Sequence, residues 1–193
     1  MKHLGTKRLE TERLILRRFK VDDAQCMFNN WASDEEVTKY LSWPPHKEVA
    51  ITKAYLEMVI KEYEELTTYN WAIELKEIGE AIGSIGVAQC QNDIDSVHIG
   101  YTLGKDWWNE GIMSEAFREV IKFLMEEVGV NRIDARHDTK NPNSGKVMEK
   151  CGLKYEGTLR QASRNNQGIC DVAWYGLLRE DYIGNKQESL HED

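Results

Sequence analysis

The 193-residue sequence is poor in proline and cysteine and contains no long apolar run. No segment approaches the roughly 18 apolar residues of a membrane-spanning helix, and residues 1–10 lack the apolar stretch of a signal peptide. The cysteines show neither a CxxC pair nor a Cys/His ligand spacing, which argues against a zinc site; they are Cys26, Cys90, Cys151 and Cys170. We therefore expect a cytoplasmic protein with reduced, buried or semi-buried thiols, no metal and no membrane contact.

Positive charge is also scarce, with 25 Lys and Arg against 33 Asp and Glu and a formal net charge of −8. Such a balance argues against binding to a nucleic acid backbone, which requires clustered cations. It favours cationic partners, although an acidic surface also serves solubility alone. With 41% hydrophobic and 30% charged residues, the composition predicts one globular domain over residues 1–193, structured over about 9–182 with flexible ends.

The first half of the chain shows a strand, two short helices, a long helix and a meander. Residues 9–19 alternate in polarity and predict a strand. Asp22 offers an N-cap for the next helix, and Ser33 with Glu36 forms a capping box for another. The apolar residues of segment 47–66 recur at helical spacing; they are Ile51, Ala54, Tyr55, Met58, Val59 and Leu66. Three antiparallel strands are expected after it, at 69–75, 81–89 and 94–103.

The second half alternates helices and strands. Residues 112–128 carry an apolar helical face, and a strand follows at 132–137. Asn141 followed by Pro begins another helix, which Gly152 ends. The closing strands fall at about 153–161 and 168–179. The predicted class is α/β (α+β), a sheet with helices packed on its faces.

The most informative passage is the strand, loop and helix start over residues 99–116. A loop that feeds a helix N-terminus presents free N–H groups and the positive end of the helix dipole, which suits a phosphate. Gly111 lets the backbone approach a ligand closely. An ordinary strand–loop–helix connection that binds no ligand has the same sequence pattern. Neither GxxxxGK[ST] nor GxGxxG occurs, so a P-loop or Rossmann site loses its support.

Several motifs in order resemble one family. The run W-W-N-E-G-I-M-S-E-A at 107–116 is similar to the acetyl-CoA pyrophosphate motif of the GNAT superfamily, and especially to its RimJ/RimL branch, which acetylates protein N-termini. The run N-P-N-S-G-K-V-M-E-K-C-G-L at 141–153 resembles the second family motif. The opening T-E-R-L-I-L-R and the closing pattern from Gly157 to Leu177 also match, so the resemblance covers about residues 9–182.

This resemblance implies a twisted mixed sheet of about seven strands, flanked by helices and splayed between its fourth and fifth strands. The pantetheine of acetyl-CoA would lie in the splay, against the backbone of Tyr101, Thr102 and Leu103. Pyrophosphate contacts, mostly through N–H groups, fall on Trp108, Asn109, Glu110, Gly111, Ile112, Met113 and Ser114. The second motif adds Asn141, Asn143 and Lys146. Trp108 and Met113 depart from the superfamily, which usually has Arg or Gln and a small residue there.

The catalytic assignments are Ser144 and His98. The resemblance suggests that Ser144 protonates the departing thiolate, with water as the alternative acid, because the family's usual tyrosine is replaced by Met148. His98 stands on a strand where related sequences often carry Glu, and an imidazole ordinarily titrates near neutrality. Glu74 is the second candidate base. The alternatives are that Ser144 is an ordinary residue of the first helical turn, that His98 is a surface histidine and that Asn141 is only an N-cap. Cys151 is interpreted as a packing residue.

The expected function is transfer of acetyl from acetyl-CoA to a primary amine, above all the α-amine of a protein N-terminus, by direct attack in a ternary complex. An α-amine has a pKa of about 7.7–8.0, so a weak base suffices. A polyamine or aminoglycoside acceptor, attracted by the acidic helix, is the same-class alternative; that helix carries Glu57, Glu62, Glu64 and Glu65. A CoA-binding sensor without turnover is another, and a nucleotide-binding enzyme has the least support. Trp43, Trp107 and Trp108 line the acceptor cleft, a homodimer contact or the core.

Overall fold

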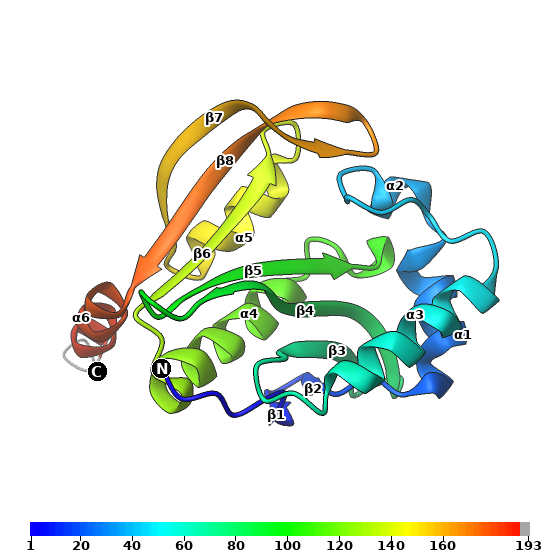
Figure 1. The fold of residues 1–193 in the computed structure, drawn as a ribbon, viewed down its shortest axis with the longest axis horizontal. Coiled ribbons are helices and arrows are strands. Elements are labelled where there is room, and N and C mark those ends of the chain that lie inside the picture. The colour runs from blue at the N-terminus through cyan, green and yellow to red at the C-terminus, as the bar shows by residue number, and fades with distance from the viewer. Residues whose placement is uncertain (190–193) are drawn as a thin grey trace.

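The computed structural model describes residues 1–189 and contains one sheet of eight strands in the order β1-β2-β3-β4-β5-β6-β8-β7 (Figure 1). Neighbouring strands are antiparallel except β5 and β6, which are parallel. The strands are β1 (Leu9–Glu10), β2 (Leu14–Arg17), β3 (Asn70–Leu75), β4 (Glu80–Gln91), β5 (Ser96–Leu103), β6 (Arg132–Asp138), β7 (Lys154–Asn165) and β8 (Gly168–Leu178). The expectation of a mixed sheet is confirmed.

The sheet splits between its two parallel strands. β5 and β6 pair only over Ser96–Ile99 and Arg132–Ala135. Beyond Ile99, β5 stays paired with β4, and beyond Ala135, β6 stays paired with β8. Figure 1 shows the two halves of the sheet diverging from that point. This is the splay expected between the strands predicted at 94–103 and 132–137.

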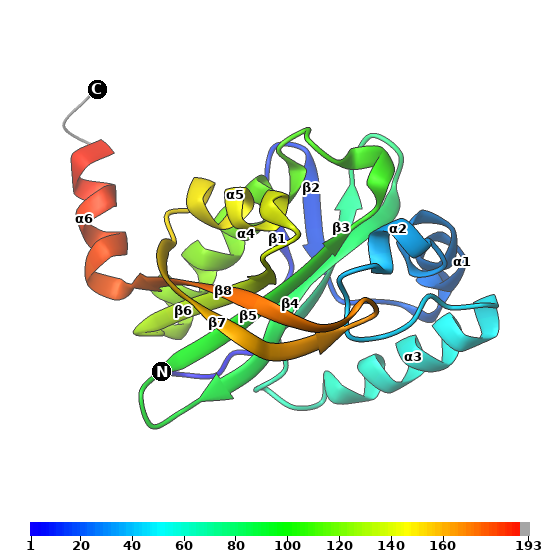
Figure 2. The same ribbon diagram turned by 90° about the horizontal axis from the view of Figure 1, so that it is seen from above.

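Helices cover both faces of the sheet, as Figure 2 shows. They are α1 (Ala24–Met27), α2 (Glu35–Thr38), α3 (Val49–Glu62), α4 (Ile112–Phe123), α5 (Pro142–Lys150) and α6 (Arg179–Ser189). A larger core joins α4 to one face, with Trp71 and Phe117 fully buried in it. A smaller core joins α1 and α3 to the other face around Met27, Leu56 and Ala72. The sheet therefore separates two hydrophobic cores.

The predicted first strand is wrong in extent, because residues 9–19 fold into β1 and β2, which pair with each other. Thr11 makes the turn: its N–H donates to the carbonyl of Leu14 at 3.0 Å, and its hydroxyl accepts from the Leu14 N–H at 3.1 Å. Alternation continues through this turn in the sequence, so the pattern does not reveal it. Leu14 and Leu16 are both fully buried, as their shared face predicts.

Both predicted N-caps in this half are also wrong. The first helical segment begins with the 3-10 turn η1 (Val21–Asp23), capped by Lys20, whose N–H donates to the Asp23 carboxylate at 2.7 Å. α2 is capped by Asp34, which accepts from the N–H of Glu36 at 2.8 Å. Ser33 instead donates its hydroxyl to the carbonyl of Phe28. Adjacent polar residues compete for a cap, and the tertiary position of the chain decides between them.

The long helix lies where expected, but its buried face is not the predicted one. α3 buries Thr52, Leu56 and Val59. Of the predicted apolar stripe only Val59 is buried, and the rest is exposed, with Ile51 at 43% and Met58 at 52%. Both stripes have helical spacing, so periodicity alone cannot choose between them.

The C-terminal half agrees more closely with its sequence signals. α4 continues into a π-helical turn η4 (Leu124–Val128), so the helix predicted over 112–128 is confirmed. α5 starts at Pro142 after Asn141 and ends before Gly152, whose φ of 89° is left-handed as expected. Helix α6 was not predicted. Of the C-terminal end, which we expect to be flexible, residues 190–193 lie outside the described part of the chain.

Candidate active site

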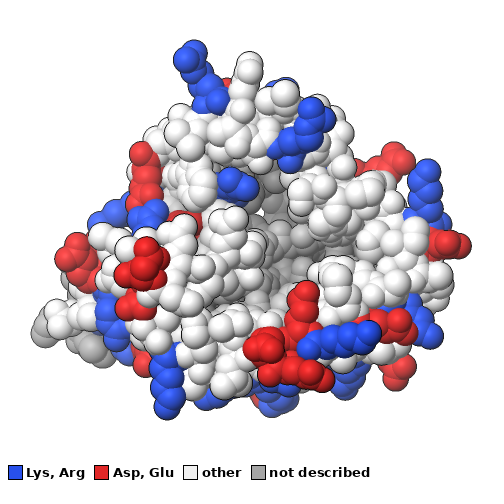
Figure 3. Space-filling model, viewed as in Figure 1, with Lys and Arg blue, Asp and Glu red and all other residues white. Residues whose placement is uncertain are grey.

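The splay between β5 and β6 opens into a cavity of about 1070 Å³. Figure 3 shows the hollow in the middle of one face, with basic side chains along its upper border and acidic ones along its lower border. Of the cofactor-binding residues and the two first-choice catalytic residues assigned from sequence, all line this cavity except Glu110. The side chain of Glu110 is exposed, and its carbonyl accepts from Arg13 at 3.0 Å. The sequence-predicted residues are therefore brought together by the fold.

The loop before α4 has the geometry of an anion site. Gly111 caps the helix with a φ of 76°, a left-handed conformation that favours glycine, and Asn109 also has a positive φ of 64°. Trp108 does not block the loop, because its indole N–H donates to the carbonyl of Leu103 at 2.8 Å. The first N–H groups of an α-helix have no acceptor within the helix. Those of Ile112, Met113 and Ser114 are thus available to an anion at the edge of the cavity.

A tether that the sequence analysis missed fixes this loop. Glu115, in the first turn of α4, accepts from the Thr11 hydroxyl at 2.6 Å, the Arg13 N–H at 3.0 Å and the Arg13 guanidinium at 2.6 Å. Because Arg13 also binds the carbonyl of Glu110, one side chain joins the loop, the helix and the β1–β2 turn. The T-E-R run contains both Thr11 and Arg13, but the sequence alone does not show which carboxylate Arg13 contacts.

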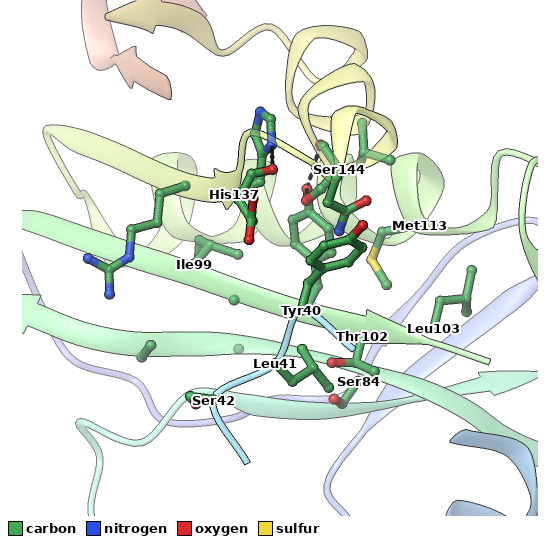
Figure 4. Close-up of a pocket in the computed structure, with 18 of the residues that line it drawn as sticks. Tyr40, Leu41, Ser42, Ser84, Ile99, Thr102, Leu103, Met113, His137 and Ser144 are labelled. Carbon is green, nitrogen blue, oxygen red and sulfur yellow. Dashed lines mark hydrogen bonds between the residues drawn. The ribbon is translucent and has the colours of Figure 1, made fainter. Parts of the chain in front are cut away.

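The opposite wall of the cleft is formed by the start of α5. Asn141 occupies the N-cap position, but its side chain makes no capping hydrogen bond, so it is free to face the cleft. Asn143 and Lys146 are exposed on the same wall. Gly145 allows α5 to approach β6, since a Cβ there would stand 2.6 Å from Nε2 of His137. Figure 4 shows His137 and Ser144 together on this side of the pocket.

Ser144 is hydrogen-bonded across the splay. The Tyr101 hydroxyl donates to the carbonyl of Ser144 at 2.8 Å and lies 3.0 Å from its Oγ (Figure 4). Tyr101 stands on β5 and Ser144 on α5, so this pair joins the two sides of the cleft. Burial raises the pKa of Tyr101 well above its ordinary value, an effect that the hydrogen bond with Ser144 only partly offsets. The motif indicates only the backbone of Tyr101 as a site group, and this side-chain contact has no signal in the sequence.

His98 lies at the apex of the splay with a carboxylate partner. Its Nδ1 is 2.5 Å from Oδ1 of Asp134, the residue opposite it on β6. The carboxylate favours a proton on Nδ1, which leaves Nε2 as the acceptor of a neutral imidazole. Glu74, the second candidate base, lies elsewhere, because its carboxylate pairs with Arg17 and does not line the cavity.

The remaining features predicted from the sequence are packing residues or residues at the border of the cavity. Cys151 is 9% exposed, and burial raises the pKa of its thiol to about 12, so its packing role is confirmed. All four cysteines are unpaired, and none is exposed. Trp43, Trp107 and Trp108 each line the cavity in part. Over residues 1–189, no group of three or more potential ligands could hold a metal, and no helix is long and apolar enough to cross a membrane.

Comparison with known proteins agrees with this geometry. A family model described as an acetyltransferase (GNAT) domain matches residues 13–154. A Bacillus licheniformis protein, Uncharacterized N-acetyltransferase p20, is 32% identical over 176 residues, which are 91% of this chain and 98% of the relative.

Ribosomal-protein acetyltransferases are also similar. The [Ribosomal protein uS5]-alanine N-acetyltransferase of Escherichia coli (strain K12) is 25% identical over 162 residues, covering 78% of this chain and 79% of that protein. The solved structure of RimL, a ribosomal alpha-N-protein acetyltransferase in complex with coenzyme A, has a TM-score of 0.80 at 18% identity, covering 89% of this chain and 98% of its own. The family model, the relatives and the split sheet agree: the chain belongs to the GNAT family of acetyltransferases and resembles its ribosomal-protein branch.

Proposed function

We propose that the protein transfers acetyl from acetyl-CoA to the α-amine of a protein N-terminus in the cytoplasm, by direct attack in a ternary complex. The observation that carries the proposal is the opening of the sheet between β5 and β6 beside the N-terminus of α4. The first residues of α4, the end of β5, Ser144 and His98 all line one cavity, which supports the proposal. The Escherichia coli relative, whose name gives a ribosomal protein as its acceptor, supports the choice of amine.

The residues present fit coenzyme A. Strand β5 is unpaired with β6 from Gly100 to Leu103, so that edge of Tyr101, Thr102 and Leu103 is open to the amides of pantetheine, although the Leu103 carbonyl already accepts from the Trp108 indole N–H. The left-handed Gly111 and the first turn of α4 offer N–H groups to the pyrophosphate. Met113, at 5% exposure, packs into the core, so its bulk does not project into solvent over the loop. Asn141, Asn143 and Lys146 supply polar groups from the other wall.

Acyl transfer requires a neutral amine, and His98 is placed to take its proton. Asp134 holds the imidazole through Nδ1, and Trp174 packs against the ring at 5.2 Å between centroids. The ring is therefore fixed in one orientation, with Nε2 as the acceptor.

Departure of the thiolate requires a proton donor on the other side of the acyl group, and Ser144 is placed for that step. Its Oγ lies 3.0 Å from the Tyr101 hydroxyl, which also holds the Ser144 carbonyl. A hydroxyl supported in this way can donate to sulfur without a large rearrangement of the site.

The test measures thiol release from acetyl-CoA with peptides that have free or blocked N-termini, spermidine and an aminoglycoside. We expect release with the free peptide alone. Ser144→Ala and His98→Gln should each lower kcat by about 100-fold, while CoA binding measured by calorimetry should stay within a few-fold. His3→Gln is the matched control, because His3 does not line the cavity and its Nε2 bonds Asn92, which does not line it either.

The panel also separates the alternatives. Glu62 lines the cavity and would favour a cationic small acceptor, so release with spermidine or the aminoglycoside but not with peptides would move the assignment to small amines. Binding of CoA without release from any amine would favour a sensor module. Undiminished release in both Ser144→Ala and His98→Gln would remove these residues from the chemistry.

A further inference from the structure

Arg136 stands on the acceptor side of the splay, next to the proposed base. It follows Ala135, the last residue of β6 that pairs with β5, and lies opposite Trp174 on β8. Its guanidinium carbon is 5.2 Å from the Trp174 ring centre, and the ring of His98 is also 5.2 Å from Trp174. Two residues apart on one strand, Arg136 and Asp134 share a face of the sheet. Because each lies 5.2 Å from the Trp174 ring centre, the guanidinium carbon of Arg136 and the ring centre of His98 are at most twice 5.2 Å apart.

The guanidinium has no carboxylate partner within residues 1–189. Asp134, its neighbour on this face, is occupied by His98 and by Arg132. Asp138, the next residue on the same face, accepts from the Lys140 N–H at 2.8 Å and the Asn165 amide at 2.6 Å. Arg136 is exposed and lines the cavity, so its charge is available to a bound molecule.

Space for such a molecule exists beside it. Gly100 follows the last β5 residue that pairs with β6, and a Cβ built on it would meet nothing within 4 Å. The indole of Trp174 limits the rotation of the guanidinium, which presents a planar fork suited to two oxygens of one carboxylate.

We propose that Arg136 determines acceptor specificity by binding a carboxylate close to the reacting amine. One hydrogen bond of about 3 Å from the amine to His98 and another from the carboxylate to Arg136 together take up much of the distance between these two side chains. The amine and the carboxylate must therefore be near neighbours, as they are when the first residue of a peptide is Asp or Glu. This inference rests on the proposed function and narrows its acceptor to acidic N-termini; a free amino acid offers the same chemistry from another source.

The test compares kcat/KM for peptides that differ only in their first residue, Asp against Asn and Glu against Gln, with free aspartate as a separate acceptor. We expect the acidic peptides to be preferred by about tenfold or more, the value of a charge-assisted hydrogen bond. In Arg136→Gln the preference should disappear, while the rate with the Asn peptide changes little. Arg164→Gln is the matched control, because Arg164 lines the same cavity from β7 and should leave the ratio unchanged.

The outcomes distinguish this inference from the proposed function. Equal rates with Asp and Asn peptides, or a preference that survives in Arg136→Gln, would overturn the role of Arg136 while leaving N-terminal acetylation intact. Arg136-dependent acetylation of free aspartate with no reaction of any peptide would support the carboxylate site and refute the protein acceptor. Loss of activity with all acceptors in Arg136→Gln would show a general role in the site and also overturn a role in specificity.

Discussion

Tyr101 keeps its hydroxyl proton at working pH, because burial raises its pKa far above neutrality. It can therefore donate a hydrogen bond but cannot act as a base. The Tyr101 proton can go to the Ser144 carbonyl or to the Ser144 Oγ, and donation to Oγ leaves the Ser144 hydroxyl proton for another acceptor. In the proposed reaction the two residues therefore act as one unit, with the Ser144 proton going to the departing sulfur and the Tyr101 hydroxyl donating to Oγ.

Tyr101→Phe should lower kcat by about tenfold, the value of one supporting hydrogen bond, with the CoA dissociation constant little changed. Because both side chains serve one proton transfer, the double variant with Ser144→Ala should be only slightly slower than Ser144→Ala alone. Steady-state kinetics of the unchanged protein, the two single variants and the double variant test this prediction. Additive losses would mean that Tyr101 acts independently of Ser144.

At the residue scale, the sequence indicated which residues gather but not how their side chains meet. Ser144 and His98 follow from motif position, and both line the cavity. Asp134 and Arg136 carry no motif; Asp134 meets His98 through the register of β5 against β6, and Arg136 meets Trp174 through the register of β6 against β8. Register between strands 36 residues apart depends on the whole fold, so local patterns cannot give it.

Among the elements, α4 shows how a distant turn prepares a binding loop. Burial alone would raise the pKa of Glu115, but its hydrogen bonds from Thr11 and Arg13, together with the charge of Arg13, lower it overall. A carboxyl whose pKa is depressed by folding stabilises the fold above its unfolded pKa and loses that contribution as the pH falls through the folded value. The tether should therefore weaken only in acid, below the ordinary range of a glutamate.

Glu115→Gln should lower the free energy of unfolding by about 1–2 kcal/mol at neutral pH, because the charge opposite Arg13 is lost. The difference from the natural protein should shrink as the pH falls below 4.5, the ordinary pKa of this side chain. CoA affinity should fall a few-fold as the loop loosens. Urea unfolding at several pH values and calorimetry measure both effects.

Glu119→Gln is the control for this tether, since Glu119 lies one turn later on α4 and its carboxylate pairs with Lys122 at 3.7 Å. It should leave CoA affinity unchanged. A Glu115→Gln protein whose stability deficit is constant with pH would contradict the assignment of the tether to the ionised carboxylate.

The elements themselves were predictable where end signals and periodicity agree. α5 carries Asn141, Pro142 and Gly152 as start and stop residues, and it forms within those limits. α3 has no such agreement, because two stripes share helical spacing and only the packing of α1 selects Leu56 over Tyr55. The β1–β2 turn was missed since Thr11 stabilises it through its side chain, without Gly or Pro.

For the whole molecule, the splay opens beyond Ile99 and Ala135 and is bridged at its far end. The backbone N–H of Asn166, at the tip of the β7–β8 hairpin, donates to the carbonyl of Leu41 at 3.1 Å. Its side-chain amide donates to the carbonyls of Thr38 and Trp43, each at 2.8 Å. Figure 4 shows Tyr40, Leu41 and Ser42 passing in front of the pocket. We therefore expect the proposed acceptor to enter beside this bridge, a route that would suit a narrow chain end.

Asn166→Ala should loosen this bridge without unfolding the protein, because it removes two side-chain hydrogen bonds and keeps the backbone one. We expect faster amide hydrogen exchange over residues 38–46 and 163–169, by about tenfold for a loss of one to two net hydrogen bonds, with unchanged exchange in β4 and β5. Gln167→Ala, the next residue in the same exposed turn, should change neither segment. If Asn166→Ala leaves both segments protected, the two sides are held by packing and the side-chain amide is dispensable. If the bridge does restrict entry, the same variant should lower the KM of a long peptide more than that of a dipeptide, because only the longer acceptor has to pass beside the hairpin tip.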